Sequence, residues 1–131
     1  MKETAHLIDS NAIIQFLDET LPEKAIDWLE QIIENEDYVI SVINEIEVLS
    51  FGGRPQALAV AERFIQNSNV IQLTSDIIAK TIEVRQQVKL KLPDAVIAAT
   101  ALVHDLIIIT RNTKDFKKVF GLTVVDPYDI T

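Results

Sequence analysis

The sequence lacks cysteine altogether and has only three glycines and four prolines. The absence of cysteine excludes a disulfide framework, a thiolate zinc site, an iron–sulfur cluster and a cysteine nucleophile. No apolar run approaches the length of about 18 residues that a membrane span requires, and the first six residues contain no apolar core of a secretory signal. We therefore expect a cytoplasmic protein without a membrane segment.

Basic residues are also few, with 12 lysines and arginines against 20 acidic residues and a formal net charge of −8. This balance argues against a protein that coats nucleic acid, because neutralising phosphates requires lysine and arginine. The charge is uneven: residues 1–53 contain two basic and twelve acidic side chains, whereas residues 54–131 contain ten and eight. This balance does not exclude a local basic patch in the second half. A solvated helix face is nevertheless the simpler interpretation of the basic residues there.

A chain of 131 residues, of which 48% are hydrophobic, has the size of a single domain, and we expect one domain over residues 1–131. Short apolar runs alternate with amphipathic stretches. The runs predict strands at 6–8, 38–41, 70–73, 106–110 and 123–125. The stretches predict helices at 11–19, 23–35, 43–51, 56–66, 76–88 and 94–105.

This alternation predicts an α/β fold with an open parallel sheet that helices cover on both faces. The run 106–110 is apolar on both faces, which is typical of a strand in the interior of such a sheet. Ligands of these folds bind beyond the carboxyl ends of the strands. Chemistry is therefore expected where polar residues follow strands.

Acidic residues occupy such positions. Asp9 directly follows the first strand and Asp115 follows the strand 106–110, while Asp94 begins a nearly apolar helix. Simple structural roles are open to each, since Asp9 can cap the next helix and Asp94 suits the positive end of a helix. Glu45 and Glu47 share the helix 43–51, but residues two apart point in different directions, and periodicity does not choose between them.

Carboxylates gathered at one sheet edge raise one another's pKa unless a positive charge balances them. The segment around Asp9 contains no lysine, so a divalent cation is the natural counter-charge. Oxygen ligands without cysteine or paired histidines favour Mg²⁺ or Mn²⁺ over zinc, and Mg²⁺ commonly retains waters or phosphate oxygens. The pattern indicates phosphate-ester chemistry.

Four segments carry a family resemblance that extends over residues 6–127. They are Leu7-Ile8-Asp9-Ser10-Asn11, Ser41-Val42-Ile43-Asn44-Glu45-Ile46-Glu47-Val48-Leu49, Leu92-Pro93-Asp94-Ala95-Val96-Ile97-Ala98-Ala99-Thr100-Ala101 and Thr110-Arg111-Asn112-Thr113-Lys114-Asp115-Phe116. Each is weak alone, but in this order and spacing the sequence resembles PIN-domain ribonucleases, and among those most closely VapC-type toxins of toxin–antitoxin pairs.

The resemblance implies a three-layer α/β/α sandwich with a central parallel sheet, a homodimer and a small antitoxin partner whose tail occupies the acidic cleft. It also implies metal-dependent hydrolysis of RNA phosphodiester bonds with Mg²⁺ or Mn²⁺. The implied catalytic and metal-binding acids are Asp9, Glu47, Asp94 and Asp115, and the implied supporting polar groups are Asn11, Thr110 and Asn112.

Because an acidic cleft repels RNA, nearby basic residues are candidates for contacting phosphates. These candidates are Lys89, Lys91, Arg111 and Lys114.

Three other functions compete with this one. The first is a PIN fold that serves as a binding or scaffolding module without turnover. The second is a receiver-type signalling domain, which needs an acidic pair after its first strand, where this chain has a single acid. The third is a haloacid-dehalogenase-type phosphatase, which needs a second aspartate where this chain has Asn11.

The two histidines, His6 and His104, lack a partner at ligand spacing, and we expect structural roles for them.

Overall fold

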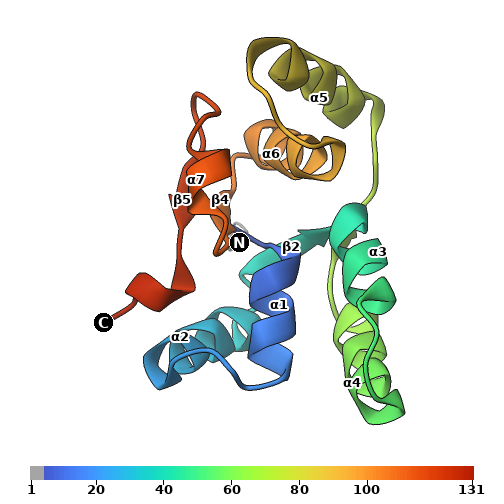
Figure 1. Ribbon diagram of the computed structural model, residues 1–131, viewed down its shortest axis with the longest axis vertical. Coiled ribbons are helices and arrows are strands. Elements are labelled where there is room, and N and C mark those ends of the chain that lie inside the picture. The colour runs from blue at the N-terminus through green and yellow to red at the C-terminus, as the bar shows by residue number, and fades with distance from the viewer. Residues whose placement is uncertain (1–4) are drawn as a thin grey trace.

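The computed structural model describes residues 5–131 and has a sheet of five strands at its centre (Figure 1). The strands are β1 (His6–Ile8), β2 (Tyr38–Ser41), β3 (Val70–Ile71), β4 (Ile107–Ile109) and β5 (Thr123–Val125). Their order is β3-β2-β1-β4-β5, and every neighbouring pair is parallel. The predicted parallel sheet is confirmed, with β4 in its interior between β1 and β5.

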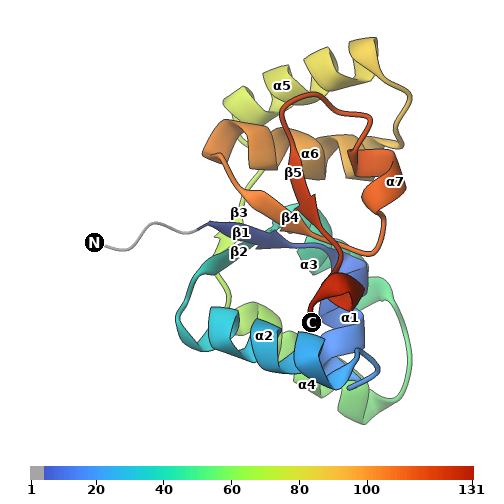
Figure 2. The ribbon, with the colours of Figure 1, turned by 90° about the vertical axis from the view of Figure 1, so that its left-hand side faces the viewer.

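Helices cover both faces of this sheet, with α5, α6 and α7 on one side and α1, α2 and α4 on the other (Figure 2). The helices are α1 (Ser10–Leu17), α2 (Glu23–Glu34), α3 (Val42–Ser50), α4 (Pro55–Gln66), α5 (Ser75–Gln87), α6 (Leu92–His104) and α7 (Thr113–Phe116). A 3₁₀ turn, η1 (Pro127–Asp129), follows β5. This arrangement is the three-layer α/β/α sandwich that the resemblance implies.

Two hydrophobic cores lie on opposite faces of the sheet, because successive residues of a strand point to opposite sides. From the strands, the core beneath α1, α2 and α4 receives Ile8, Ile40 and Ile109. The core beneath α6 receives Leu7, Val39 and Ile108. Most residues of the interior strands β1, β2 and β4 are therefore buried, as in other parallel sheets with helices on both faces, whereas the edge strands β3 and β5 are only partly covered.

Several elements differ from the sequence prediction, most of them by one or two residues at an end. The sequence predicts no helix after the strand 106–110, but Thr113–Phe116 forms the short helix α7, whose Phe116 is fully buried. A single turn contains too few residues to show apolar periodicity. The predicted strand 70–73 is confined to Val70–Ile71, since Leu73 lies exposed in the loop before α5.

None of the helices in residues 5–131 combines the length and the hydrophobicity that a membrane span needs. The expected absence of a secretory signal concerns the first six residues, of which residues 1–4 lie outside the described part of the chain.

The parallel strands place the carboxyl ends of β1, β2 and β4 at one edge of the sheet. Asp9, the start of α3 and Thr110 consequently meet at that edge.

Candidate functional site

A cleft of about 500 Å³ opens at this edge and gathers three of the four predicted acids. Asp9 comes from the end of β1, Glu47 from α3 and Asp94 from the first turn of α6. Asn11 and Asn112 line the same cleft. Segments that are distant in the sequence therefore contribute oxygen-bearing side chains to one solvent-accessible space.

Asp9 is almost fully buried and accepts four hydrogen bonds. Its Oδ1 accepts from the backbone N–H of Ser10 at 2.9 Å and from Asn44 Nδ2 at 3.2 Å. Its Oδ2 accepts from Thr110 Oγ1 at 2.8 Å and from Asn11 Nδ2 at 3.3 Å. Asp9 is also the N-cap of α1, so the capping role considered for it is present together with its place in the cleft.

Burial raises the pKa of Asp9 to about 6, and the negative charges of Asp94 and Glu47 contribute in the same direction. The hydrogen bonds from Thr110 and Ser10 oppose this rise because they stabilise the ionised carboxylate. A carboxylate whose pKa stays raised although several donors contact it would be stabilised in its ionised form by a neighbouring cation.

The predicted supporting residues form a second layer around Asp9. Asn11 Nδ2 also donates to Thr110 Oγ1 at 3.1 Å, and Asn11 Oδ1 accepts from the backbone N–H of Arg111 at 2.9 Å. The backbone N–H of Asn112 donates to Thr110 Oγ1 at 3.0 Å. These contacts join the start of α1 to the loop after β4 and restrict the orientation of the Asp9 carboxylate.

The structure distinguishes the two glutamates of α3 by position. Glu47 lines the cleft, and its Oε1 accepts a hydrogen bond of 2.6 Å from Ser10 Oγ. Glu45 is absent from the cleft lining. The pair was indistinguishable by periodicity because both have apolar neighbours, whereas the packing of α3 against α1 turns only Glu47 toward Asp9.

Asp94 and Asp115 stand in contrasting environments. The pKa of Asp94 is raised, first by partial burial and then by the charges of Glu47 and Asp115, while Lys91 opposes the shift. The pKa of Asp115 is lowered by Asn112 and by Lys118, whose Nζ lies 3.4 Å from Asp115 Oδ1. Asp115 is near enough to influence Asp94 but does not line the cleft.

The predicted RNA-contacting residues are exposed but differ in their surroundings. Arg111 Nη1 lies 2.8 Å from Asp126 Oδ2, and the guanidinium stacks over Tyr128 at 3.6 Å from the ring centre. Lys91 immediately precedes α6 and is close enough to affect Asp94. Lys89 lies in the loop before Lys91, and Lys114 is on α7.

Ser10 and Asn44 belong to the network although sequence reasoning gave them no role. Asn44 Nδ2 donates to Ser10 Oγ at 2.9 Å as well as to Asp9. Both residues stand within the quoted motifs, but a serine after a strand and an asparagine in a first helical turn are ordinary capping residues. Nothing in the sequence alone connects segments that lie 34 residues apart.

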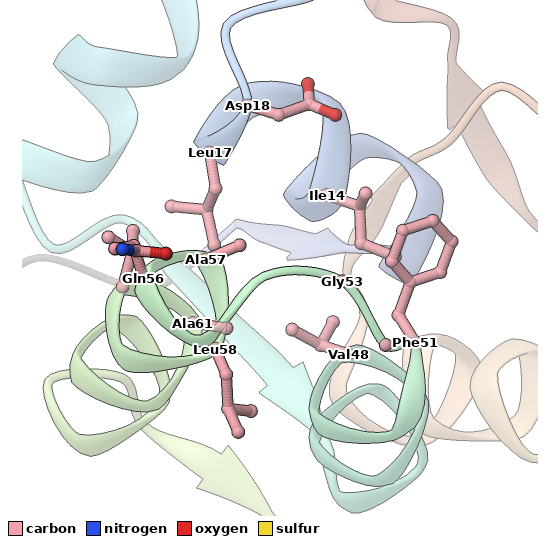
Figure 3. A pocket seen from close by; sticks show the side chains of 12 residues that line it. Ile14, Leu17, Asp18, Val48, Phe51, Gly53, Gln56, Ala57, Leu58 and Ala61 are labelled. Atoms are coloured by element: carbon pink, nitrogen blue, oxygen red, sulfur yellow. The ribbon is translucent and has the colours of Figure 1, made fainter.

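A second hollow, of about 300 Å³ and mostly apolar, adjoins the acidic cleft. It lies between α1, α3 and α4, and Figure 3 shows Ile14, Leu17 and Val48 pointing into it. We call this hollow the apolar groove. Ile14, Asp18 and Phe51 line both the groove and the cleft, so the two are continuous.

The protein-family model of the PIN domain matches residues 6–121 of the sequence, and the chain therefore belongs to the PIN-domain family. Among solved structures, a chain of a toxin–antitoxin complex from Klebsiella pneumoniae is 34% identical, with a TM-score of 0.75 over 96% of this chain and 100% of that one. No curated protein matches this sequence.

Chains of two VapBC structures bound to DNA share the fold at lower identity. The chain from Salmonella typhimurium is 23% identical, with a TM-score of 0.81 over 94% of this chain and 98% of that one. The chain of VapBC2 from Rickettsia felis, bound to a promoter fragment, is 19% identical, with a TM-score of 0.79 over 92% and 97%. The fold and the family predicted from the sequence are thus confirmed.

Proposed function

We propose that this protein is a metal-dependent endoribonuclease that hydrolyses RNA phosphodiester bonds, and that it is the toxin of a toxin–antitoxin pair. The observation that carries the proposal is the shared cleft of Asp9, Glu47 and Asp94, with Asp115 beside it. Burial and mutual repulsion raise the pKa of Asp9 and Asp94, which is the electrostatic condition that a divalent cation relieves.

The residues present fit Mg²⁺ or Mn²⁺ by the chemistry of their donors. In residues 5–131, no three histidine, cysteine, aspartate or glutamate side chains form a ready metal-ligand cluster. Mg²⁺ usually takes one or two carboxylates and keeps several waters, so an open cleft with spaced carboxylates suits it. In this proposal Asp9, Glu47, Asp94 and Asp115 hold the ion directly or through water. A bound ion supplies Lewis acidity and lowers the pKa of a coordinated water.

The chain itself contributes orientation and charge. Thr110, Asn11, Asn44 and the backbone N–H of Ser10 hold Asp9 as a hydrogen-bond acceptor on both oxygens. Asn112 supports Thr110 through its backbone N–H. This preorganisation places negative charge at one end of the cleft without a reorganisation step during reaction.

For substrate binding, we propose that Lys89, Lys91 and Lys114 contact phosphates that flank the scissile bond. All three are exposed, Lys91 and Lys114 lie close enough to Asp94 and Asp115 to affect the pKa of those acids, and Lys89 precedes Lys91 in the same loop. Arg111 is the fourth candidate. Its guanidinium already pairs with Asp126, so a phosphate would have to share or replace that partner. Such backbone contacts position RNA without reading its sequence.

We further propose that the apolar groove receives a segment of the antitoxin. The complex from Klebsiella pneumoniae supports such a partner, and the continuity of the groove with the acidic cleft indicates the chemistry of the segment. Apolar side chains would fill the groove, and a basic side chain would reach the carboxylates. The resemblance also predicts a homodimer, which light scattering would report as twice the chain mass of 14.7 kDa.

The partner proposal is tested with the protein encoded by the short reading frame that is expected immediately upstream of the gene. Phe51→Asp introduces a charge into the groove, whereas Ile46→Asp introduces one at an exposed apolar residue of α3 that does not line the groove. We expect Phe51→Asp alone to weaken binding of the upstream product in calorimetry. Equal binding by both variants and the unmodified protein would remove the groove from the proposal.

The nuclease proposal is tested by incubating the purified protein with labelled RNA, with Mn²⁺, with Mg²⁺ and with a chelator. We expect cleavage only with metal, and losses of about 100-fold or more in Asp9→Asn, Asp94→Asn and Glu47→Gln, because changes in groups that merely support a metal already cost about 10- to 100-fold. Glu45→Gln is the matched control on the same helix and retains activity.

Three outcomes would contradict the nuclease proposal. Cleavage that persists in the chelator, or full activity in both aspartate variants, would refute the assigned site. Absence of cleavage on every RNA in the presence of Mn²⁺ would favour the non-catalytic binding module instead.

A further inference from the structure

Asn44 is a fully buried polar side chain beside the cleft, with no exposed surface. It stands in the first turn of α3, and its Oδ1 accepts a hydrogen bond of 2.8 Å from the backbone N–H of Ser41. Because a carbonyl oxygen accepts and an amide nitrogen donates, this contact fixes the orientation of the amide. Both hydrogens of Nδ2 must therefore point away from Ser41, toward the acidic cleft.

The two hydrogens have separate acceptors. One is directed to Asp9 Oδ1 at 3.2 Å and the other to Ser10 Oγ at 2.9 Å. Since Ser10 Oγ accepts from Asn44, its own single proton is free to be donated, and it lies 2.6 Å from Glu47 Oε1. The direction of every hydrogen bond is thereby determined, and each branch ends on a carboxylate.

We infer that Asn44 is a positioning residue that holds two acids of the cleft at once, Asp9 directly and Glu47 through Ser10. The inference rests on the proposed function, in which these carboxylates hold a divalent ion. Partners that orient metal ligands typically contribute about 10- to 100-fold to metal affinity. Asn44 would accordingly be needed for the geometry of the ion site although the bound ion would never contact it.

A purely structural role is the alternative, because Asn44 and Ser41 also form the capping box of α3. Replacing Asn44 by leucine removes its donors as well as this cap, so the two roles must be separated. Ser41→Ala is the matched control: it removes the hydroxyl that accepts from the backbone N–H of Ile43 but leaves the backbone N–H that orients Asn44. Ser10→Ala interrupts only the branch to Glu47.

The experiment measures the binding of Mn²⁺ alone, without RNA, by titration calorimetry, together with thermal unfolding of each variant. We expect Asn44→Leu to bind Mn²⁺ about 10- to 100-fold more weakly, and Ser10→Ala to bind it more weakly than the unmodified protein does. Ser41→Ala should have a lower Tm but the original Mn²⁺ affinity. If Asn44→Leu fails to fold, the comparison of Ser10→Ala with Ser41→Ala decides.

Unchanged Mn²⁺ affinity in folded Asn44→Leu or in Ser10→Ala would overturn the inference. A loss of affinity in Ser41→Ala as large as that in Asn44→Leu would do the same, because it would trace the effect to the start of the helix. If the unmodified protein binds no Mn²⁺, the proposed metal site itself is refuted and the inference falls with it. The two failures are therefore distinguishable.

Discussion

At the scale of single residues, Asp9 illustrates how a site can oppose the stability of the fold that contains it. Its carboxylate is buried beside two other acids, and four donors only partly offset the loss of water. Burying a charge without a matching counter-charge is costly. The residue nevertheless caps α1, so its negative charge is retained at the positive end of a helix, where it is best tolerated.

This environment predicts a particular dependence of stability on pH in the metal-free protein. Asp9 binds its proton more tightly in the folded chain, with a pKa of about 6, than at its ordinary value of 3.8. The free energy of unfolding should therefore decrease as pH rises from about 4 to about 6, by about 3 kcal/mol in full from this residue. Urea unfolding at several pH values in a chelator measures the decrease.

Asp9→Asn is the control for this prediction, because asparagine has the same shape but cannot ionise. Its stability should lack the Asp9 contribution, so the stability difference between the variant and the unmodified protein should shift in the variant's favour as pH rises. The raised pKa of Asp94 acts in the same direction and remains in both proteins. A constant difference across this pH range would contradict the assignment of the effect to Asp9.

At the scale of elements, several helix ends place acidic residues in the left-handed conformation. Glu19, Glu36 and Asp105 follow α1, α2 and α6 with φ angles of 61°, 56° and 56°. Glycine is the usual residue at such positions because it has no Cβ. A negative charge there also opposes the negative end of the helix, so these ends are not optimised for stability.

Glu36→Gly should therefore stabilise the protein by about 1 kcal/mol, since a left-handed non-glycine residue costs about 1–2 kcal/mol and glycine loses more entropy on folding. Chemical unfolding provides the measurement. Glu36→Ala is the matched control, because it removes the charge and keeps the Cβ. Equal gains from alanine and glycine would show that charge, and not backbone strain, determines the effect.

At the scale of the whole molecule, the fold brings an acidic first half and a basic second half to the same edge. Asp9 and Glu47 belong to the half that carries most of the negative charge, while Lys89 and Lys91 lead into α6 and Asp94. A protein with a net charge of −8 repels RNA at long range. Local lysines must then supply the attraction near the cleft.

Charge reversal at these lysines should reduce RNA cleavage and also the sensitivity of cleavage to salt, because fewer counterions are released when fewer phosphates are neutralised. The double variant Lys89→Glu, Lys91→Glu tests this through rates measured at several salt concentrations. Lys24→Glu, on α2, compared with Lys91→Glu alone, serves as a control for the change in net charge. Rates and salt dependence that match the unmodified protein would remove Lys89 and Lys91 from the substrate path.

Much of this architecture can be predicted from the sequence. The alternation of apolar runs and amphipathic stretches predicts the parallel sandwich, and the three strands 6–8, 38–41 and 123–125 have the predicted bounds. The helix α7 was missed because one turn has no measurable period. The ion pair of Arg111 with Asp126 was also inaccessible, since it depends on how η1 folds back beside the loop after β4.

The sequence by itself determined the fold class and the candidates Asp9, Asp94 and Asp115, because side-chain periodicity and position relative to a strand are local properties of the chain. The family followed from the resemblance of four segments in their order and spacing. The resemblance favours Glu47 over Glu45, but only the tertiary structure shows that Glu47 lines the cleft with Asp9 while Glu45 does not, and that a buried asparagine links the two acids. The physical reason is that the rotation of α3 about its axis is set by packing against α1 and α4, and these contacts join segments whose relation no local pattern records.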